Sequence, residues 1–229
     1  MISIIIPTYN EEATIGALIP YLLKHGGHLV KEVIVCDGGS VDNTLTIASE
    51  KGVRPLNCPE MGRAAQMNYG AALSTGEILY FIHADTLPPP GFASDIIGAV
   101  EERFACGRYQ TRFDSNKWLL KINAFFTRFD WFVCYGGDQT FFITRELFAS
   151  IDGFNANMKI MEEYDLTERA KQKGRYKIFN KSALVSARKY KDRSWGQVQM
   201  ANRKAVQLYK KGASQMEIIA TYQALLKNK

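Results

Sequence analysis

The sequence predicts an α/β fold in which a mostly parallel central sheet is flanked by helices and followed by C-terminal helices. The main observation is alternation: apolar, strand-like segments at residues 2–6, 30–36, 53–57 and 77–82 are separated by helix-like segments at 11–24, 42–51, 63–73 and 91–103. Such alternation favours a parallel sheet with right-handed crossovers. A second observation is that acidic loops follow several of these strands, where an open α/β sheet places its binding crevice.

The rhythm changes after residue 104. Residues 109–113 and 140–144 are predicted to be strands, 118–132 an aromatic amphipathic helix, and 195–229 two helices separated near Gly212. Asn10 and Asp42 are expected to cap the first two helices. Because no repeat, low-complexity tract or linker interrupts the chain, we expect a single domain over 1–229, with parts at 1–104, 105–190 and 191–229.

The composition favours a cytoplasmic globular protein. The 229 residues are 46% hydrophobic and carry a net charge of +6, so anionic partners are favoured, among them a sugar nucleotide, an acidic lipid surface and nucleic acid. The four cysteines show no CxxC pairing, so we expect reduced thiols and no zinc site. No apolar run approaches the roughly 20 residues that span a bilayer, so membrane association is expected to be peripheral.

Two similar strand ends carry the most informative residues. The first strand breaks at Pro7 and continues as Thr8-Tyr9-Asn10-Glu11-Glu12, and the second ends in Asp37-Gly38-Gly39-Ser40. Adjacent loops of this kind form one crevice, in which a carboxylate can accept hydrogen bonds from a base or ribose while glycine permits close approach. For Asp37 alone, an Asx-turn that merely ends the strand is the alternative. Asp42 is explained by helix capping.

Further motifs follow in a fixed order. They are Gly62-Arg63 to Gly70 at a helix start, His83-Ala84-Asp85 after an apolar strand, Gly136-Gly137-Asp138-Gln139 before another strand, and Met161-Glu162-Glu163-Tyr164-Asp165-Leu166. Together with the two strand ends, these motifs resemble the inverting glycosyltransferases of family 2, which have the nucleotide-sugar-binding GT-A fold. The resemblance runs from Ile2 to about Ala187 and is strongest to the branch called rSAM/selenodomain-associated transferase 2.

The resemblance implies a donor site in the first 104 residues. The residues expected to bind the nucleotide sugar are Pro7, Thr8, Tyr9, Asn10, Glu12, Asp37, Gly39, Arg63, Asn68, His83, Ala84 and Asp85. Asp85 is the expected ligand of a divalent cation, Mg²⁺ or Mn²⁺, which one carboxylate and two diphosphate oxygens can hold. His83 stands where the family's Asp-x-Asp motif has its first aspartate, which leaves metal dependence open. Arg63 can also be an ordinary solvated charge.

The resemblance also implies an acceptor and catalytic part at 105–190. Gly137, Asp138 and Gln139 are expected to line the junction of donor sugar and acceptor. Glu163 matches the position of the family's catalytic base, and Glu162 remains a competitor because glutamate replaces the family's aspartate. The alternative is that these acids only complement the dipole at a helix start.

The predicted activity is inverting transfer of a sugar, hexosyltransferase-like, from a nucleoside diphosphate sugar to a hydroxyl acceptor, a saccharide or lipid. A sugar nucleotidyltransferase and a degenerate sugar-nucleotide-binding protein are the alternatives. Nucleic acid is not an expected partner. The basic residues of the C-terminal region, from Arg188 onward, form either a solvated surface or a peripheral contact with the inner face of an anionic membrane.

Overall fold

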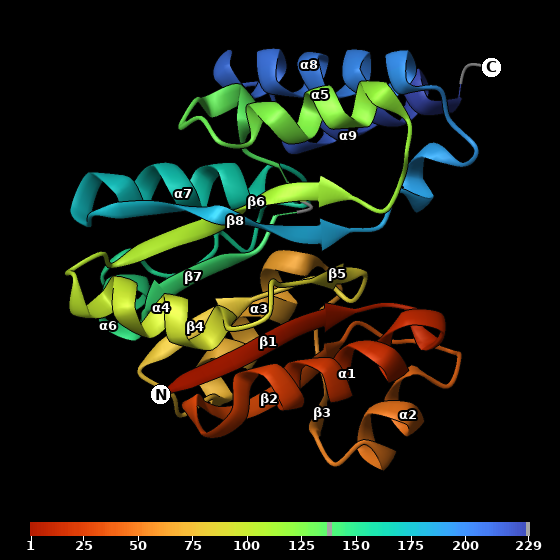
Figure 1. Ribbon diagram of the computed structural model, residues 1–229. Coiled ribbons are helices and arrows are strands. Elements are labelled where there is room, and N and C mark those ends of the chain that lie inside the picture. Colours follow the sequence, from red (N-terminus) through yellow and green to blue (C-terminus); the bar gives the residue numbers. More distant parts are fainter. Residues whose placement is uncertain (137–138, 228–229) are drawn as a thin grey trace.

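The computed structural model describes residues 1–136 and 139–227, which form a three-layered α/β structure around a mixed sheet (Figure 1). The strands are β1 (Ile2–Thr8), β2 (Val30–Asp37), β3 (Arg54–Asn57), β4 (Ile78–Phe81), β5 (Thr86–Leu87), β6 (Cys106–Phe113), β7 (Phe141–Thr144) and β8 (Tyr176–Val185). The helices are α1 (Glu12–Gly26), α2 (Thr44–Glu50), α3 (Arg63–Leu73), α4 (Phe92–Glu101), α5 (Trp118–Phe126), α6 (Arg145–Ser150), α7 (Glu162–Lys173), α8 (Trp195–Lys210) and α9 (Gln215–Lys227). Short 3₁₀ turns lie at η1 (Gly27–Leu29), η2 (Phe132–Cys134) and η3 (Arg188–Tyr190).

The sheet confirms the predicted fold class. Its order is β3-β2-β1-β4-β7-β6-β8-β5. Strands β3, β2, β1 and β4 pair in parallel, and β7 runs antiparallel to its neighbours β4 and β6. Strand β8 pairs parallel with β6, and β5 is the edge strand, antiparallel to β8. The β1–β2 register places Thr8 opposite Asp37, so the two polar strand ends meet at one edge.

Alternation along β1 explains the two layers of helices. Ile4 and Ile6 are fully buried in a cluster that includes the apolar faces of α1 and α4, whereas Ile5 is buried against α3, α6 and α7 on the other face. Burying one such side chain contributes about 1.5–3 kcal/mol. Helix α3 lies close to the sheet because Gly70 has no side chain: a Cβ there would lie 2.4 Å from the Cys36 sulfur.

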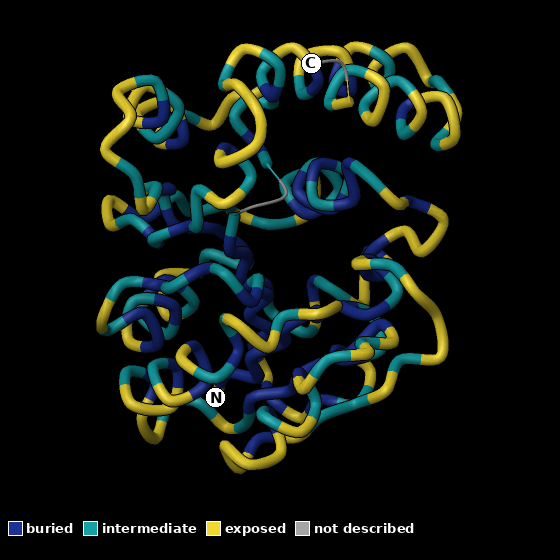
Figure 2. The backbone as a smooth tube through the Cα atoms, turned by 90° about the vertical axis from the view of Figure 1, so that its right-hand side faces the viewer, coloured by how far each residue is buried: buried dark blue, intermediate teal, exposed yellow. Residues whose placement is uncertain are grey.

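Three helices form a separate layer beyond β6 and β8. Helices α5, α8 and α9 lie together at this end of the molecule (Figure 1), and Figure 2 shows mostly exposed backbone on their outer side. Ser194 starts α8 with a reciprocal capping box to Gln197. Within the two described stretches of chain, no helix combines the length and apolar character needed to cross a membrane.

Several element predictions need correction. The helix expected at 118–132 ends at Phe126. The buried guanidinium of Arg108 donates to the carbonyls of Thr127 and Phe129, so these groups are not available to continue the helix. Helix α6 and strand β8 were not predicted. Neither Asn10 nor Asp42 is the N-cap residue, since α1 and α2 begin one residue later, after Glu11 and Asn43.

Candidate functional site

Asp37 ends β2 with a carboxylate that is fully buried and fully hydrogen-bonded. Its Oδ2 accepts from the backbone N–H groups of Gly39 at 2.8 Å and Ser40 at 2.7 Å. Its Oδ1 accepts from the hydroxyls of Thr8, at 3.1 Å, and Ser40. An ionised carboxylate offers about four lone-pair sites, so these contacts saturate it. The Asx-turn interpretation of Asp37 therefore describes its observed contacts, and the carboxylate shapes the loop.

The first loop is tied to the second by its exposed residues. Asn10 has a left-handed φ of 54°, and its Oδ1 accepts from the backbone N–H of Val41 at 3.0 Å. The Glu12 carboxylate accepts from the backbone and side-chain amides of Asn43. Tyr9, which precedes Asn10, is 53% exposed, and Gly39 on the second loop adopts φ 96°. These hydrogen bonds hold the loops that follow β1 and β2 side by side, and the ring of Tyr9 on the first loop is accessible to solvent.

Helix α3 carries Asn68, which was predicted to bind the donor, and Gln66, for which no role was predicted. Gln66 is buried, and its Nε2 donates to the carbonyls of Thr8 at 2.7 Å and Cys36 at 2.8 Å, holding the two strand ends together. Asn68 exchanges two hydrogen bonds with the backbone of Phe154 at 2.7 and 2.9 Å. Both amides act as positioning groups. Asn68 links α3 to the loop before α7.

The His83-Ala84-Asp85 segment connects β4 to β5. Ala84 is buried, whereas the side chains of His83 and Asp85 are 15% and 16% exposed. The Asp85 carboxylate lies 3.0 Å from Nε of Arg188, and the same guanidinium pairs with Glu11, with Nη1 to Oε2 at 2.7 Å. The sequence placed Arg188 only among the basic C-terminal residues, because nothing local signals a partner about one hundred residues away.

Glu162 and Glu163 open α7 after Met161, which has a left-handed φ of 69°. Glu163 Oε1 lies 3.3 Å from Nη1 of Arg63 and 3.6 Å from Nε2 of His83, and Glu162 lies 3.6 Å from Nε of Arg63. Burial and the neighbouring Glu162 carboxylate raise the pKa of Glu163, while Arg63 and His83 oppose the increase. A raised pKa makes a carboxylate a stronger proton acceptor, as a general base requires.

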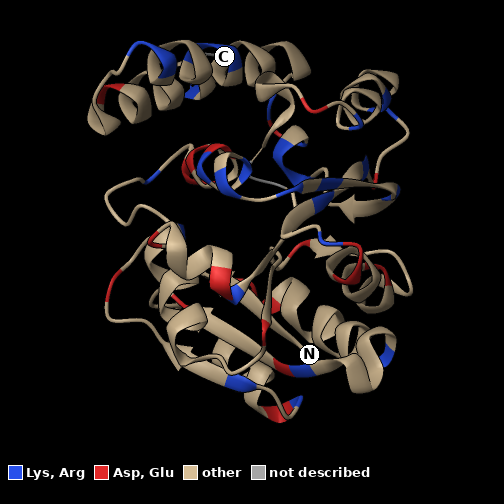
Figure 3. Ribbon diagram, turned by 90° about the vertical axis from the view of Figure 1, so that its left-hand side faces the viewer, with Lys and Arg blue, Asp and Glu red and all other residues tan. Residues whose placement is uncertain are grey.

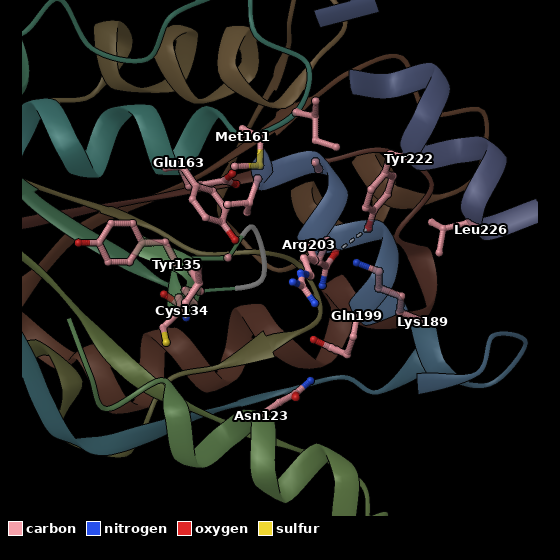
Figure 4. A pocket seen from close by; sticks show the side chains of 18 of the residues that line it. Asn123, Cys134, Tyr135, Met161, Glu163, Lys189, Gln199, Arg203, Tyr222 and Leu226 are labelled. Carbon is pink, nitrogen blue, oxygen red and sulfur yellow. Dashed lines mark hydrogen bonds between the residues drawn. The ribbon is translucent and has the colours of Figure 1, made fainter. Parts of the chain in front are cut away.

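A chamber of about 1360 Å³ lies next to these acids, between α5 and the C-terminal helices. Arg63, Glu162 and Glu163 form one part of its wall, and Figure 4 shows Glu163 on the opposite side from Tyr222 and Leu226. Gln139 also lines it and donates from Nε2 to the Cys134 carbonyl at 2.8 Å. The predicted residues Gly137 and Asp138 lie outside the described residues.

The chain offers little coordination for a metal by itself. Across residues 1–136 and 139–227, no group of three or more His, Cys, Asp or Glu side chains is placed to hold an ion. Asp85 supplies one carboxylate, and His83 lies against Glu163. Mg²⁺ and Mn²⁺ commonly take one or two carboxylates together with substrate phosphates, so this donor set fits a cation that arrives with a diphosphate.

The comparisons with known proteins agree on one family. Residues 3–164 match the family model described as glycosyl transferase family 2. A PGL/p-HBAD biosynthesis glycosyltransferase of Mycobacterium bovis is 30% identical over 207 residues, which cover 81% of this chain and 72% of that protein. A glucosyl-3-phosphoglycerate synthase of Mycobacterium tuberculosis is 34% identical over 106 residues, 42% of this chain. The matched segment spans only 33% of that synthase.

Solved structures share the fold at low sequence identity. S. aureus TarS 1-349 in complex with UDP-GlcNAc superposes with a TM-score of 0.69 at 18% identity, over 98% of this chain and 71% of that one. The Mycobacterium tuberculosis glucosyl-3-phosphoglycerate synthase in complex with Mn²⁺, UDP and glucosyl-3-phosphoglycerate has a TM-score of 0.59 at 20% identity, over 93% of this chain and 80% of that one.

Proposed function

Because the chain belongs to glycosyl transferase family 2, we propose that it transfers a sugar from a nucleoside diphosphate donor to a hydroxyl acceptor in a single inverting displacement. The observation that carries the proposal is the position of Glu163. Its carboxylate contacts Arg63 and His83 on the donor side and also lines the chamber, so it lies where a donor and an acceptor would meet.

The donor would bind at the loops that follow β1 and β2. Tyr9 provides an exposed ring there, while Asp37 and Gln66 keep the loops in place through buried hydrogen bonds. The two structural neighbours described above were solved with UDP-GlcNAc and with UDP, which makes a uridine donor the first to test. The cations of Arg63 and Arg188 would lie beside the diphosphate and favour its departure.

Glu163 would act as general base. In the proposed step its carboxylate takes the proton of the acceptor hydroxyl, the hydroxyl oxygen forms the new bond to the anomeric carbon, and the bond from that carbon to the diphosphate oxygen breaks. The bonding electrons leave with the diphosphate, and one displacement inverts the configuration. Asp85 would hold a divalent cation together with the diphosphate, and that cation would neutralise negative charge on the leaving group.

The direct test measures release of the nucleoside diphosphate from a panel of UDP, GDP, CDP and dTDP sugars, with and without Mn²⁺. A ligand at about 100 times its dissociation constant should also stabilise the fold by roughly 2.7 kcal/mol in a thermal-shift assay. Stabilisation without release from any donor and acceptor mixture would favour a binding protein without catalysis.

The base is identified by two matched variants. Glu163→Gln keeps size and polarity but cannot accept a proton, so turnover should fall by roughly 10²-fold or more while donor affinity is unchanged. Glu168→Gln on the same helix serves as the control. If Glu162→Gln loses turnover instead, Glu162 is the base. Full activity of both Glu162→Gln and Glu163→Gln would mean that these acids only complement the dipole at the start of α7.

A further inference from the structure

The chamber beyond Glu163 is strongly cationic. Its lining residues other than Arg63 include six Lys or Arg, and the acids among its described lining residues are Glu162 and Glu163. The six cations are Lys159, Lys189, Arg193, Arg203, Lys210 and Lys227. Figure 3 shows how Lys and Arg dominate the charged residues of the C-terminal helices. Clustered like charges in a concave site repel each other and attract an anionic ligand.

These cations belong to the acceptor side. Of the candidate donor residues, all of which the structure describes, only Arg63 lines the chamber, and Asp37 and Asp85 do not. Among the described residues, none of the ion pairs involves Arg193, Arg203 or Lys210. The donor diphosphate has Arg63 and Arg188 on its own side, so it does not account for the charge of the chamber.

The chamber also has an apolar part. Trp131, Trp195, Ile219 and Leu226 line it, and the ammonium group of Lys189 lies 5.5 Å from the ring centre of Tyr222. In Figure 4, Arg203 and Lys189 extend toward the middle of the chamber, between Glu163 and Leu226. The two cations therefore lie between the carboxylate of Glu163 and the apolar side chain of Leu226.

Its size and polar groups fit a ligand larger than a simple hydroxyl compound. Ligand sites are commonly about 300–1,000 Å³, and this chamber is about 1360 Å³. Gln199 lines it with an amide whose Nε2 is buried and makes no hydrogen bond to any described residue. A buried N–H donor of this kind is stabilised when a ligand oxygen accepts from it.

We infer that the acceptor is an anionic amphiphile, a hydroxyl compound in which a phosphate or carboxylate lies between the reacting hydroxyl and an apolar group. The hydroxyl would reach Glu163, the anion would lie against Arg203 and Lys189, and the apolar group would pack toward Trp195 and Leu226. This inference rests on the proposed sugar transfer for the word acceptor, but the ligand class rests on the chamber alone.

The test measures binding without any donor. Trp131 and Trp195 line the chamber, so titration with n-octyl phosphate below its micelle concentration should change tryptophan fluorescence in a saturable way. Octanol and inorganic phosphate should each bind at least about tenfold more weakly, since each lacks one half of the ligand. A parallel titration with octanoate shows whether the site prefers a phosphate or a carboxylate.

Matched variants of α8 locate the binding. Arg203→Gln should weaken octyl phosphate binding by about tenfold or more, the scale of one charge-assisted hydrogen bond. The exposed neighbour Lys204 is not part of the lining, so Lys204→Gln should bind as the unmodified protein does. Lys189→Gln provides a second variant on a different element. Equal binding by all three variants and the unmodified protein would overturn the inference.

Two further outcomes would also overturn it. Inorganic phosphate binding as tightly as octyl phosphate would mean an anion site alone. Binding to phosphatidylglycerol vesicles that Lys204→Gln and Arg203→Gln weaken equally, without octyl phosphate binding, would mean a membrane-facing surface. Failure of the sugar-nucleotide panel with intact octyl phosphate binding would instead count against the transferase proposal and leave the ligand class standing.

Discussion

The reactivity expected of Glu163 is set by the groups around its carboxyl. Burial and Glu162 raise its pKa, whereas the Arg63 and His83 side chains lower it. The net effect is a pKa above the ordinary value of 4.5. A carboxyl with a raised pKa gains its charge at a higher pH than an ordinary glutamate does.

The pH dependence of transfer should report this balance. Activity should rise with pH through the pKa of Glu163, so the midpoint of the acidic limb of kcat/KM should lie above 4.5. Arg63→Gln removes a cation that lowers this pKa, so the midpoint should move to higher pH. The measurement is a pH–rate profile for both proteins, with Arg54→Gln as a surface control. An unchanged or lower midpoint in Arg63→Gln contradicts the assignment.

The raised pKa of Glu163 should also make the free energy of unfolding depend on pH. A carboxyl whose pKa is raised by folding favours the folded state while protonated, and this contribution is lost as the pH rises through the raised value. Glu163→Gln cannot ionise, so it should be more stable than the unmodified protein at about pH 8 and similar at about pH 4. Urea unfolding at both pH values measures this. Lower stability of the variant at the higher pH would contradict it.

At the scale of elements, the strand ends are built from hydrogen bonds that cross between them. Asp37 accepts from both the loop that follows it and Thr8 of β1, and Gln66 of α3 donates to both strands. The loops proposed to bind the donor are therefore held in place by buried polar groups.

Asp37→Asn should accordingly destabilise the protein. The amide group of asparagine donates where the carboxylate accepted, so some of the N–H and O–H groups of Gly39, Ser40 and Thr8 would lose their partner. An unsatisfied buried group costs about 1–3 kcal/mol. The free energy of unfolding in urea and the affinity for UDP should both fall, with the exposed Asp192→Asn as control. A stable variant with intact UDP binding would show that the loop does not need this carboxylate.

The fold could be predicted where the signal was local. Residues 2–6 are apolar except for Ser3 and lie in β1. Strand β8 instead contains Lys177, Asn180 and Lys181, and its register shifts opposite Tyr109 and Gln110. Its alternation is therefore broken, and the strand was missed. The same holds for the site. The motif containing Glu163 is contiguous and can be recognised in the sequence, whereas the Arg188–Asp85 contact depends on the packing of distant segments.

At the scale of the whole molecule, Arg188 connects the C-terminal part of the chain to two loops of the N-terminal half. Its guanidinium contacts Glu11 at the start of the first helix and Asp85 after β4, while its own segment leads into the helices that form the chamber. The Arg188 guanidinium contacts Asp85, the one carboxylate expected to hold a metal. Donor, metal and Arg188 would therefore interact at the same carboxylate.

This arrangement leads to a prediction that does not depend on catalysis. Removing a cation from Asp85 should strengthen Mn²⁺ binding in the absence of nucleotide, so Arg188→Gln should bind Mn²⁺ roughly two- to fivefold more tightly, the scale of a partly exposed ion pair. The same variant should bind UDP more weakly, because one cation near the diphosphate is lost. Electron paramagnetic resonance titration measures free Mn²⁺, calorimetry measures UDP, and Lys191→Gln on the neighbouring exposed segment is the control. If Arg188→Gln leaves Mn²⁺ affinity unchanged while Asp85→Asn abolishes it, the Arg188 contact does not compete with the metal. If neither variant changes it, Asp85 is not the ligand.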